Sequence, residues 1–353
     1  MNKRSEREAV VEVSGVWKIF GSRANEAMAA VERDNLSKPE VLERFQAVVG
    51  VRNVSFSVEE GEIFCIMGLS GSGKSTLVRH VNRLIEPTAG EIRINGVTVG
   101  DLGSEALREL RADKIGMVFQ NMALLPHRTV ADNIAFALEL RNVDAFTRAQ
   151  VAEQVIERVS LQGYGDRMPS ELSGGMQQRV GLARALAADP DILLMDEPFS
   201  ALDPLIRRGL QDEFLELSRN MGKTTLFITH DLDEAIRMGT HIAIMKDGEV
   251  VQIGTPEDIV TKPADDYVAD FVQGISKLKL VFAHTVMQPI AQYEGSHGAL
   301  SIESCPKATP DDDLDKLVEL SVDQPKPVVI MDDGNAVGVV TKDALLHGIQ
   351  GEA

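Results

Sequence analysis

The sequence predicts an α/β fold that contains a parallel β-sheet, with a smaller domain at the C-terminal end. The apolar run Ile63–Met67 has the composition of a fully buried strand, and a glycine-rich loop and a helix start at Ser75 follow it. A second apolar run, Ile192–Met195, ends at the carboxylates Asp196 and Glu197. Because open α/β sheets bind ligands at the carboxyl ends of their strands, both sequences are expected to face one binding crevice.

The glycine-rich loop has the composition of a phosphate-binding loop. Glycines permit left-handed backbone angles, so successive N–H groups can surround an anion, and the helix that follows adds positive potential. Lys74 is expected to reach the β- and γ-phosphates, and the Ser75 hydroxyl is expected to bind Mg²⁺. A plain Gly/Ser-rich turn is the alternative, but Lys-Ser-Thr in register behind a strand argues against it. The residues predicted to hold the triphosphate are Gly68, Ser70, Gly71, Ser72, Gly73, Lys74, Ser75 and Thr76.

The two carboxylates after the second strand are candidates for chemistry on that triphosphate. Asp196 is expected to hold Mg²⁺ through water. Glu197 is the candidate general base that polarises the attacking water. Taken alone, the pair could equally be an exposed acidic turn, so the interpretation depends on the phosphate loop beside it.

The segment Leu172–Arg179, with the sequence LSGGMQQR, predicts a second phosphate contact. Ser173, Gly174 and Gly175 precede a helix expected over residues 176–188, so this helix N-terminus offers open N–H donors. The segment has no lysine and no carboxylate of its own for a metal, so it can cap a phosphate but cannot hold a nucleotide. Its expected ligand is the γ-phosphate bound by a second copy, in a head-to-tail homodimer that sandwiches two ATP molecules. Serving as a helix N-cap, the simpler role for a serine, is compatible with this one.

Taken together, these motifs resemble those of the ATP-binding subunits of ABC transporters, over roughly residues 10–260. Leu172–Gly175 matches the signature of that superfamily. The resemblance implies that Gln120 contacts Mg²⁺ and the attacking water, and that His230 contacts the γ-phosphate. It also implies that Asp203 belongs to the loop that crosses the dimer. The implied catalytic residues are Glu197, His230, Gln120 and Lys74, and the implied metal ligands are Ser75, Gln120 and Asp196.

The same resemblance places Phe20 where an aromatic ring stacks on adenine. Stacking on a base needs no particular partner, so a ring at this position suffices. Trp17, the only tryptophan, is close by, and either ring could instead be a core residue of the strand expected over residues 10–20. His230 could likewise be an ordinary histidine at the end of a strand.

The domain organisation also follows from this resemblance. An ABC-type nucleotide-binding domain, with a mixed sheet core, is expected over residues 1–275, and a mostly helical subdomain over residues 100–180 carries the signature. Apolar spacing predicts helices over residues 130–141 and 147–160. Strands are expected over residues 10–20 and 48–67, with hairpin turns at Asn95-Gly96 and Asp247-Gly248.

The segment 120–127 is apolar but has the composition of a loop. An apolar loop beside the predicted active-site glutamine is a candidate docking surface for an integral membrane permease. Packing in the core is the alternative for this segment.

Residues 21–48 form an unusual insertion between the first two strands. Two short helices are expected, over residues 25–33 and 39–45, and Ser37 with Glu40 has the pattern of a capping box. With this insertion the chain resembles ATPases that drive the uptake of choline, glycine betaine and proline betaine. An import ATPase for another small solute, such as an amino acid, a soluble ABC ATPase and a regulatory binding protein without turnover remain as alternatives.

The predicted C-terminal domain, residues 276–353, resembles a single CBS module with a small α+β fold. The segments 284–289 and 327–341 carry this resemblance, with a turn expected at Asp333-Gly334. Only one unit fits in the length, and it contains the acidic run 311–313. A dimerisation appendage is therefore preferred to a sensor of nucleotide or ionic strength.

Composition limits the partners and the location. The net charge of −18 argues against nucleic acid or anionic lipid as a partner of the whole surface. Cys65 lies in a predicted buried strand far from Cys305, so no disulfide framework is expected. Residues 1–8 have no signal-peptide pattern, and no stretch is long and apolar enough to span a membrane. The expected location is peripheral, on the cytoplasmic face of the inner membrane, where the chain docks on a permease. An extracytoplasmic solute-binding protein is expected to deliver the solute to that permease.

Overall fold

The computed structural model describes residues 9–200, 202–273, 275–322, 324–332 and 334–350. Residues 1–8, on which the signal-peptide prediction rests, lie outside this range. The described residues form two compact units that divide between Ile253 and Gly254, whereas the boundary was expected after residue 275. The earlier division follows from Glu257, whose carboxylate accepts hydrogen bonds from the Phe282 amide (3.4 Å) and the Thr285 hydroxyl of the C-terminal unit.

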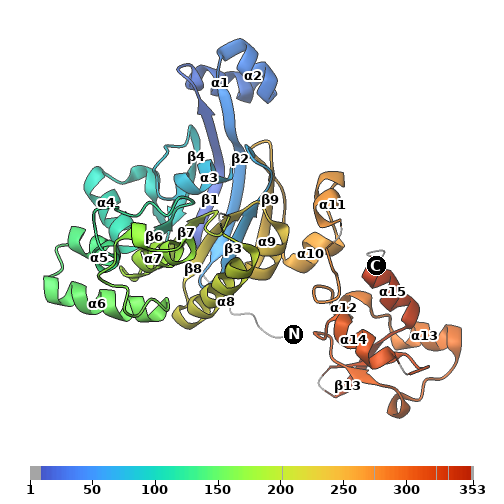
Figure 1. Cartoon of the computed structure of the whole chain (residues 1–353). Coiled ribbons are helices and arrows are strands. Elements are labelled where there is room, and N and C mark those ends of the chain that lie inside the picture. The colour runs from blue at the N-terminus through green and yellow to red at the C-terminus, as the bar shows by residue number, and fades with distance from the viewer. Residues whose placement is uncertain (1–8, 201, 274, 323, 333, 351–353) are drawn as a thin grey trace. The chain divides into compact units, whose positions relative to one another are not determined.

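The first unit contains an antiparallel sheet of four strands in the order β2-β1-β4-β5. β1 and β2 are paired along their length, and Phe20 at the end of β1 faces Val48 at the start of β2. The insertion between them is therefore held at this end of the sheet (Figure 1). The strands are β1 (Ala9–Phe20), β2 (Val48–Glu59), β4 (Ala89–Ile94) and β5 (Val97–Thr98).

The second sheet of this unit has six strands in the order β10-β9-β3-β8-β7-β6. β6, β7, β8, β3 and β9 run parallel to one another. Met67 pairs with Thr229, and Asp196 with Ile228, so three segments that follow adjacent strands leave one edge of the sheet. The strands are β3 (Ile63–Met67), β6 (Ile115–Val118), β7 (Ile192–Asp196), β8 (Thr224–Thr229), β9 (His241–Lys246) and β10 (Glu249–Gly254).

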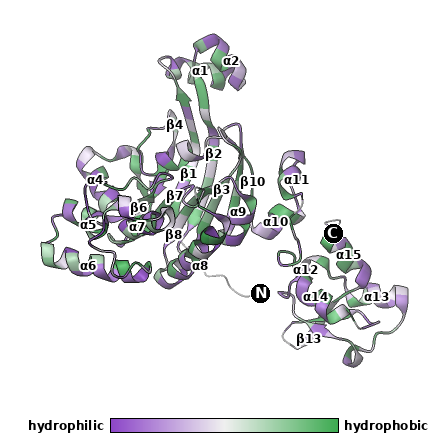
Figure 2. Ribbon diagram, viewed as in Figure 1, coloured by the Kyte–Doolittle hydropathy of each residue, from purple (hydrophilic) through white to green (hydrophobic). Residues whose placement is uncertain are grey.

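Every residue of β3, β7 and β8 is buried, as expected for central strands covered on both faces. Leu77 and Val78 of helix α3 (Lys74–Val81) pack against these strands, with Ile66 and Ile228 in the same core. Figure 2 shows hydrophobic colour along the strands and hydrophilic colour on the outward parts of the helices. The core therefore fixes the sheet edge from which the loops of the site emerge.

Both helices predicted between residues 130 and 160 are present, as α5 and α6, and the two predicted hairpin turns join β4 to β5 and β9 to β10. Thr129 caps α5 and Asp144 caps α6, each by accepting a hydrogen bond from the backbone three residues later. The helices of the first unit beyond the insertion are α3 (Lys74–Val81), α4 (Ser104–Asp113), α5 (Val130–Leu140), α6 (Ala145–Arg158), α7 (Gly174–Leu186), α8 (Pro204–Met221) and α9 (Leu232–Met238).

The insertion forms the two predicted helices, α1 (Ala24–Asp34) and α2 (Lys38–Phe45). The Glu40 carboxylate accepts hydrogen bonds from the Ser37 amide at 2.8 Å and the Ser37 hydroxyl at 2.6 Å, so this side chain stabilises the start of α2. Val41 packs in a separate small core that also contains Ile19 and Val49 of the strands. The insertion is thus a packed element with its own apolar core.

The second unit contains a three-stranded sheet in the order β11-β12-β13, parallel between the first two strands and antiparallel between the last two. The strand, turn, strand and helix predicted from residue 327 onward are β12, β13 and α15; Asp333 of the turn lies outside the described residues. Among the described residues of both units, no helix is both long and apolar enough to cross a membrane. The elements of this unit are α10 (Pro256–Thr261), α11 (Asp266–Val272), α12 (Ala283–Val286), α13 (Ile290–His297), β11 (Lys307–Ala308), α14 (Leu314–Ser321), β12 (Val328–Asp332), β13 (Asn335–Val340) and α15 (Lys342–Gln350).

Candidate nucleotide-binding site

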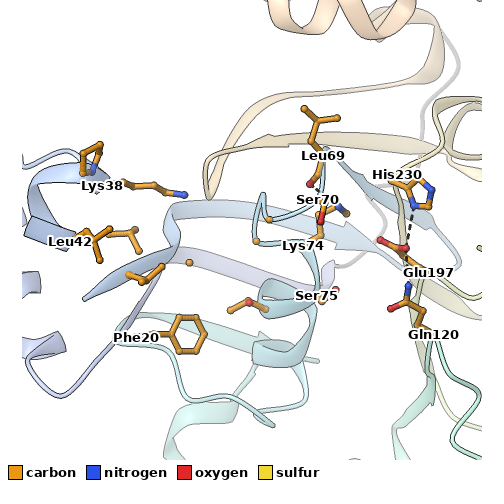
Figure 3. A pocket seen from close by; sticks show the side chains of 17 residues that line it. Phe20, Lys38, Leu42, Leu69, Ser70, Lys74, Ser75, Gln120, Glu197 and His230 are labelled. Atoms are coloured by element: carbon orange, nitrogen blue, oxygen red, sulfur yellow. Dashed lines mark hydrogen bonds and ion pairs between the residues drawn. The ribbon is translucent and has the colours of Figure 1, made fainter. Parts of the chain in front are cut away.

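A pocket of about 960 Å³ lies in the first unit, over the phosphate loop (Figure 3). It brings together segments from β1, the insertion, the phosphate loop and the ends of three strands of the second sheet. Ten of the predicted site residues line it: Phe20, Ser70, Gly71, Gly73, Lys74, Ser75, Thr76, Gln120, Glu197 and His230.

The loop after β3 is folded around the Lys74 side chain. Its ammonium group donates hydrogen bonds to the carbonyls of Gly68 (2.7 Å) and Leu69 (3.1 Å). Gly73 has φ +101°, and a Cβ built there would lie 2.3 Å from the Gly50 carbonyl oxygen, so no larger residue fits. Burial lowers the pKa of Lys74, and the charges of Glu197 and Asp196 oppose that shift. An anion bound in the loop would favour the charged lysine in the same way.

Asp196 lies beneath the loop and is almost fully buried. Its Oδ1 accepts a hydrogen bond from the Ser75 hydroxyl at 2.7 Å, and its Oδ2 is 3.2 Å from the Arg79 guanidinium. Ser75, Asp196 and the amide of Gln120 supply oxygen donors, which are the ligands that Mg²⁺ prefers. The chemistry of these residues therefore fits a magnesium site shared with a phosphate chain.

Glu197 is the point at which three strand-end segments converge. Its Oε2 accepts a hydrogen bond from Gln120 Nε2 at 3.3 Å and lies 3.2 Å from His230 Nδ1 (Figure 3). The backbone of Glu197 has φ +47°, a left-handed conformation that is costly for a residue with a side chain. The Glu197 amide donates to the Ile228 carbonyl at 3.1 Å, which helps to hold this conformation. The carboxylate is thus presented at the sheet edge between an amide and an imidazole.

The structure distinguishes Phe20 from Trp17. Phe20 is 40% exposed and lines the pocket, with its ring against the backbone of Gly50. Trp17 packs against the small core of the insertion, with the Arg52 guanidinium 5.7 Å from its ring centroid. Of the two rings, that of Phe20 lines this pocket and that of Trp17 does not.

The remaining predicted residues do not line this pocket. Ser72 is buried, and the Gly68 carbonyl accepts a hydrogen bond from Lys74. Ser173 caps α7 by accepting a hydrogen bond from the Met176 amide at 3.3 Å, and it is exposed. The predicted residues that lie elsewhere on the same chain are Ser173, Gly174, Gly175 and Asp203.

The loop that follows β6 is not part of the core, because none of residues 120–127 is buried. Met122 and Ala123 both have positive φ. The Arg184 guanidinium, on α7, donates to the carbonyls of Met122 (2.7 Å) and Ala123 (2.6 Å), and burial lowers the pKa of Arg184. A second pocket of about 940 Å³ lies beside this loop and includes the exposed Leu140. The loop thus joins the glutamine of the site to the signature helix.

Seven residues that line the nucleotide pocket were not predicted from the sequence, and three of them lie on α2: Lys38, Pro39 and Leu42. The other four are Val48, Val49, Gly50 and Leu69. The signal that could have found the three on α2 is the position of the insertion. Since it leaves β1 directly after Phe20 and returns at Val48, its helices must lie beside the predicted stacking ring.

Comparisons with known proteins agree with this geometry. The ABC transporter family profile matches residues 51–200. The chain is 53% identical over 283 residues to the glycine betaine transport ATP-binding protein OpuAA of Bacillus subtilis, covering 80% of this chain and 68% of that protein. It is 46% identical over 338 residues to the trimethylamine N-oxide transport system ATP-binding protein TmoW of Ruegeria pomeroyi, covering 96% of each.

Among solved structures, the chain is similar to the ATP-binding cassette MJ0796, which was determined as a dimer in a post-hydrolysis state bound to ADP and Pi. The match has a TM-score of 0.59 and 32% identity, and it covers 70% of this chain and 98% of the cassette. The sequence motifs, the pocket and these similarities agree. The chain belongs to the ABC transporter family, as an ATP-binding protein whose P-loop fold binds and hydrolyses ATP.

Proposed function

We propose that this chain powers the uptake of a quaternary amine, such as choline, glycine betaine or proline betaine, through a separate membrane permease. The observation that carries the hydrolytic part is the convergence of Gln120, Glu197 and His230 beside the phosphate loop. Each residue follows a different strand of one sheet, so the fold itself brings the three side chains together.

In this proposal Lys74 and the N–H groups of residues 70–76 hold the phosphate chain, and Phe20 stacks on adenine. Ser75, Asp196 and Gln120 would hold Mg²⁺, which supplies positive charge that offsets the charge developing on the phosphates. Arg79 keeps the Asp196 carboxylate oriented toward Ser75 through its contact with Oδ2. The grouping of these side chains supports the proposal because most of the rate enhancement in phosphoryl transfer comes from positioning and electrostatics.

Glu197 orients and polarises the attacking water, and His230 contacts the γ-phosphate. The 3.2 Å contact between His230 and Glu197 supports a shared task, because each side chain fixes the position of the other. Gln120 donates a hydrogen bond to Glu197 and would also bind Mg²⁺, so it can report whether the site is occupied. The strained backbone at Glu197 agrees with a functional position.

The second contact to the γ-phosphate is supplied by another copy of the chain. Ser173 and Gly174 are exposed at the start of α7, Gly175 behind them is buried, and none of the three lines the pocket of its own chain. Asp203, at the start of α8, belongs to the loop that crosses to the partner. In a two-fold homodimer, the phosphate loop of each chain would face the signature of the other. The two sites would then be equivalent, and no further copy could be added at this interface.

The permease is proposed to dock beside residues 120–127, on the second pocket and the exposed Leu140. This would place the chain at the cytoplasmic face of the inner membrane, with the extracytoplasmic solute-binding protein acting on it only through the permease. The net charge of −18 gives no support to a nucleic-acid partner.

Trimethylamine N-oxide is a second candidate solute. The relative named for that solute matches 96% of its length, whereas the glycine betaine relative matches 68% of its length. All these solutes carry methyl groups on a tetrahedral nitrogen, so related permeases and binding proteins could select any of them.

For the C-terminal unit we propose a single CBS-like module that serves as a dimerisation appendage. Its small sheet and the flanking helices α14 and α15 agree with that expectation, and its core includes Leu314, Val328 and Val340.

The test is ATP hydrolysis by the chain reconstituted with its permease and binding protein in proteoliposomes. We expect that choline, glycine betaine, proline betaine or trimethylamine N-oxide stimulates hydrolysis and is imported, and the four solutes tested singly identify the substrate. Stimulation by amino acids alone would contradict the proposed substrate class, and no hydrolysis under any condition would contradict the enzymatic role.

A further inference from the structure

We propose that the insertion of α1 and α2 is part of the nucleotide site: Leu42 forms a second apolar wall for the nucleoside, and Lys38 supplies positive charge to the phosphate chain. The inference rests on the proposed function, because it assumes that the ligand of the pocket is a nucleoside triphosphate. It extends that function by giving the insertion a direct role in ligand binding.

The topology places α2 beside the site. β1 ends at Phe20, opposite Val48 at the start of β2, and the insertion occupies the whole connection between them. Val41 is fully buried in the small core, whereas its neighbour Leu42 is 49% exposed and lines the pocket. Because Val41 anchors the helix, Leu42 is held at the rim of the pocket.

Exposed apolar side chains gather at this pocket. Phe20, Leu42, Val48 and Leu69 all line it, and each is between 40% and 59% exposed. Such a group beside a phosphate loop is costly in water, and it suits a ligand with a flat apolar part next to its charged part. A purine nucleoside attached to a phosphate chain has this chemistry.

The Lys38 side chain points into the same pocket (Figure 3). Its Nζ would lie 3.3 Å from a Cβ built on Gly248, whose amide donates a hydrogen bond to the Ser72 carbonyl at 3.0 Å. The ammonium group is therefore near the turn that packs on the phosphate loop. Within the described part of the chain it forms no hydrogen bond or ion pair of its own.

The charges around Lys38 are of both signs. Burial lowers the pKa of Lys38, the charges of Asp247 and Glu249 oppose this shift, and Arg52 adds to it. A triphosphate bound in the loop would bring several negative charges close to the ammonium group. The bound ligand would thus favour the charged form of Lys38.

The experiment measures the dissociation constants of ATP and of inorganic tripolyphosphate for the full chain at low and high salt. For Leu42→Ala we expect ATP binding about fivefold weaker and tripolyphosphate binding unchanged, since the leucine contacts only the nucleoside. For Lys38→Met we expect both ligands to bind about fivefold more weakly at low salt, with a smaller difference at high salt. Leu84→Ala, also at an exposed leucine but outside the pocket, is the matched control.

Several outcomes would overturn the inference. Unchanged ATP binding in both variants would exclude a role for α2, and an equal loss of tripolyphosphate binding in Leu42→Ala would show that the leucine only supports the loop. Both side chains are partly exposed, so the thermal midpoints should match that of Leu84→Ala; Leu42→Gln provides a second substitution if Leu42→Ala is unstable. If the wild-type chain bound neither ligand, the proposed function itself would fail, which is a distinguishable result.

Discussion

The phosphate-loop side and the signature side of this molecule use the same device, a loop that leads into a helix N-terminus, but only the first is complete within one chain. Lys74, Ser75 and Asp196 are buried or half-buried and are joined by hydrogen bonds of 2.7–3.1 Å to each other or to the loop. Ser173 and Gly174 are exposed, and the Ser173 side chain has one bond, to the backbone of its own helix.

This difference separates ATP binding, which needs one chain, from catalysis, which in the proposed mechanism needs two. A site that its own chain satisfies can hold ATP in a single protomer. Donors that are exposed and lie outside that pocket can contribute only when a second chain supplies a phosphate to them. The substitutions below change the phosphate-loop side, the signature side, the loop contact of Arg184 that connects them, or neither side.

Glu197→Gln should have the largest effect. The substitution keeps the shape of the side chain but removes the base, so turnover should fall about a thousandfold while ATP binding persists. Since the bound ATP is not consumed, a dimer should accumulate. Phosphate release and light scattering with ATP measure the two effects.

The exposed glutamate variant Glu60→Gln is the control, with turnover like that of the wild type. Normal turnover in Glu197→Gln would show that the base is misassigned.

Ser173→Asp should lower turnover about a hundredfold without loss of fold stability. Aspartate is as good a helix N-cap as serine, so α7 keeps its start, but its charge repels the triphosphate of the partner. Ser173→Ala separates the two roles, because it removes the cap and should lower the free energy of unfolding by about 1 kcal/mol.

Turnover assays and urea unfolding on both variants provide the measurements. If Ser173→Asp hydrolysed ATP as fast as the wild type, the signature would have no contact with the nucleotide.

Arg184→Met should have an intermediate effect, because it removes the connection between the two sides. The carbonyls of Met122 and Ala123 lose their donor, so Gln120 should be held less firmly and turnover should fall about fivefold. ATP binding by the phosphate loop should not change. The control Arg158→Met, at the exposed last residue of α6, should behave as the wild type. Weaker ATP binding in Arg184→Met would contradict the expectation that Arg184 affects turnover through Gln120 and leaves the phosphate loop unchanged.

Glu234→Gln should have the smallest effect and should change stability alone. Burial raises the pKa of Glu234, although hydrogen bonds from Thr229 and Gln211 oppose the shift. The folded chain thus favours the protonated carboxyl, and this contribution to stability is lost as pH rises through the raised pKa. Glutamine stays neutral and still accepts from Gln211, so the variant should gain about 1 kcal/mol at pH 8 and little at pH 4. Urea unfolding at both pH values decides; a variant less stable than the wild type at pH 8 would contradict the cause given.

Much of the site was predictable because sequence-local patterns fix it. Lys74, Asp196 and His230 could be predicted because each lies at or shortly after the end of an apolar run typical of a buried strand. Parallel pairing then brings those strand ends to one edge of the sheet. Arg184 could not be predicted in this way, since its partners are more than 60 residues away and depend on the path of the loop. The boundary between the units also depends on tertiary contacts, those of Glu257 with residues 282–285.

The central claim is that two chains share each catalytic site, and mixing two impaired variants tests it most directly. Lys74→Ala disables the phosphate loop and Ser173→Asp disables the signature, so each alone should have no more than about a hundredth of the wild-type rate. In a mixed dimer, one site would pair an intact phosphate loop with an intact signature. A 1:1 mixture should therefore recover about a quarter of the wild-type rate, since half of the dimers would be mixed, each with one intact site. No recovery above the separate variants would contradict shared sites, because chains that act alone would each retain their own lesion.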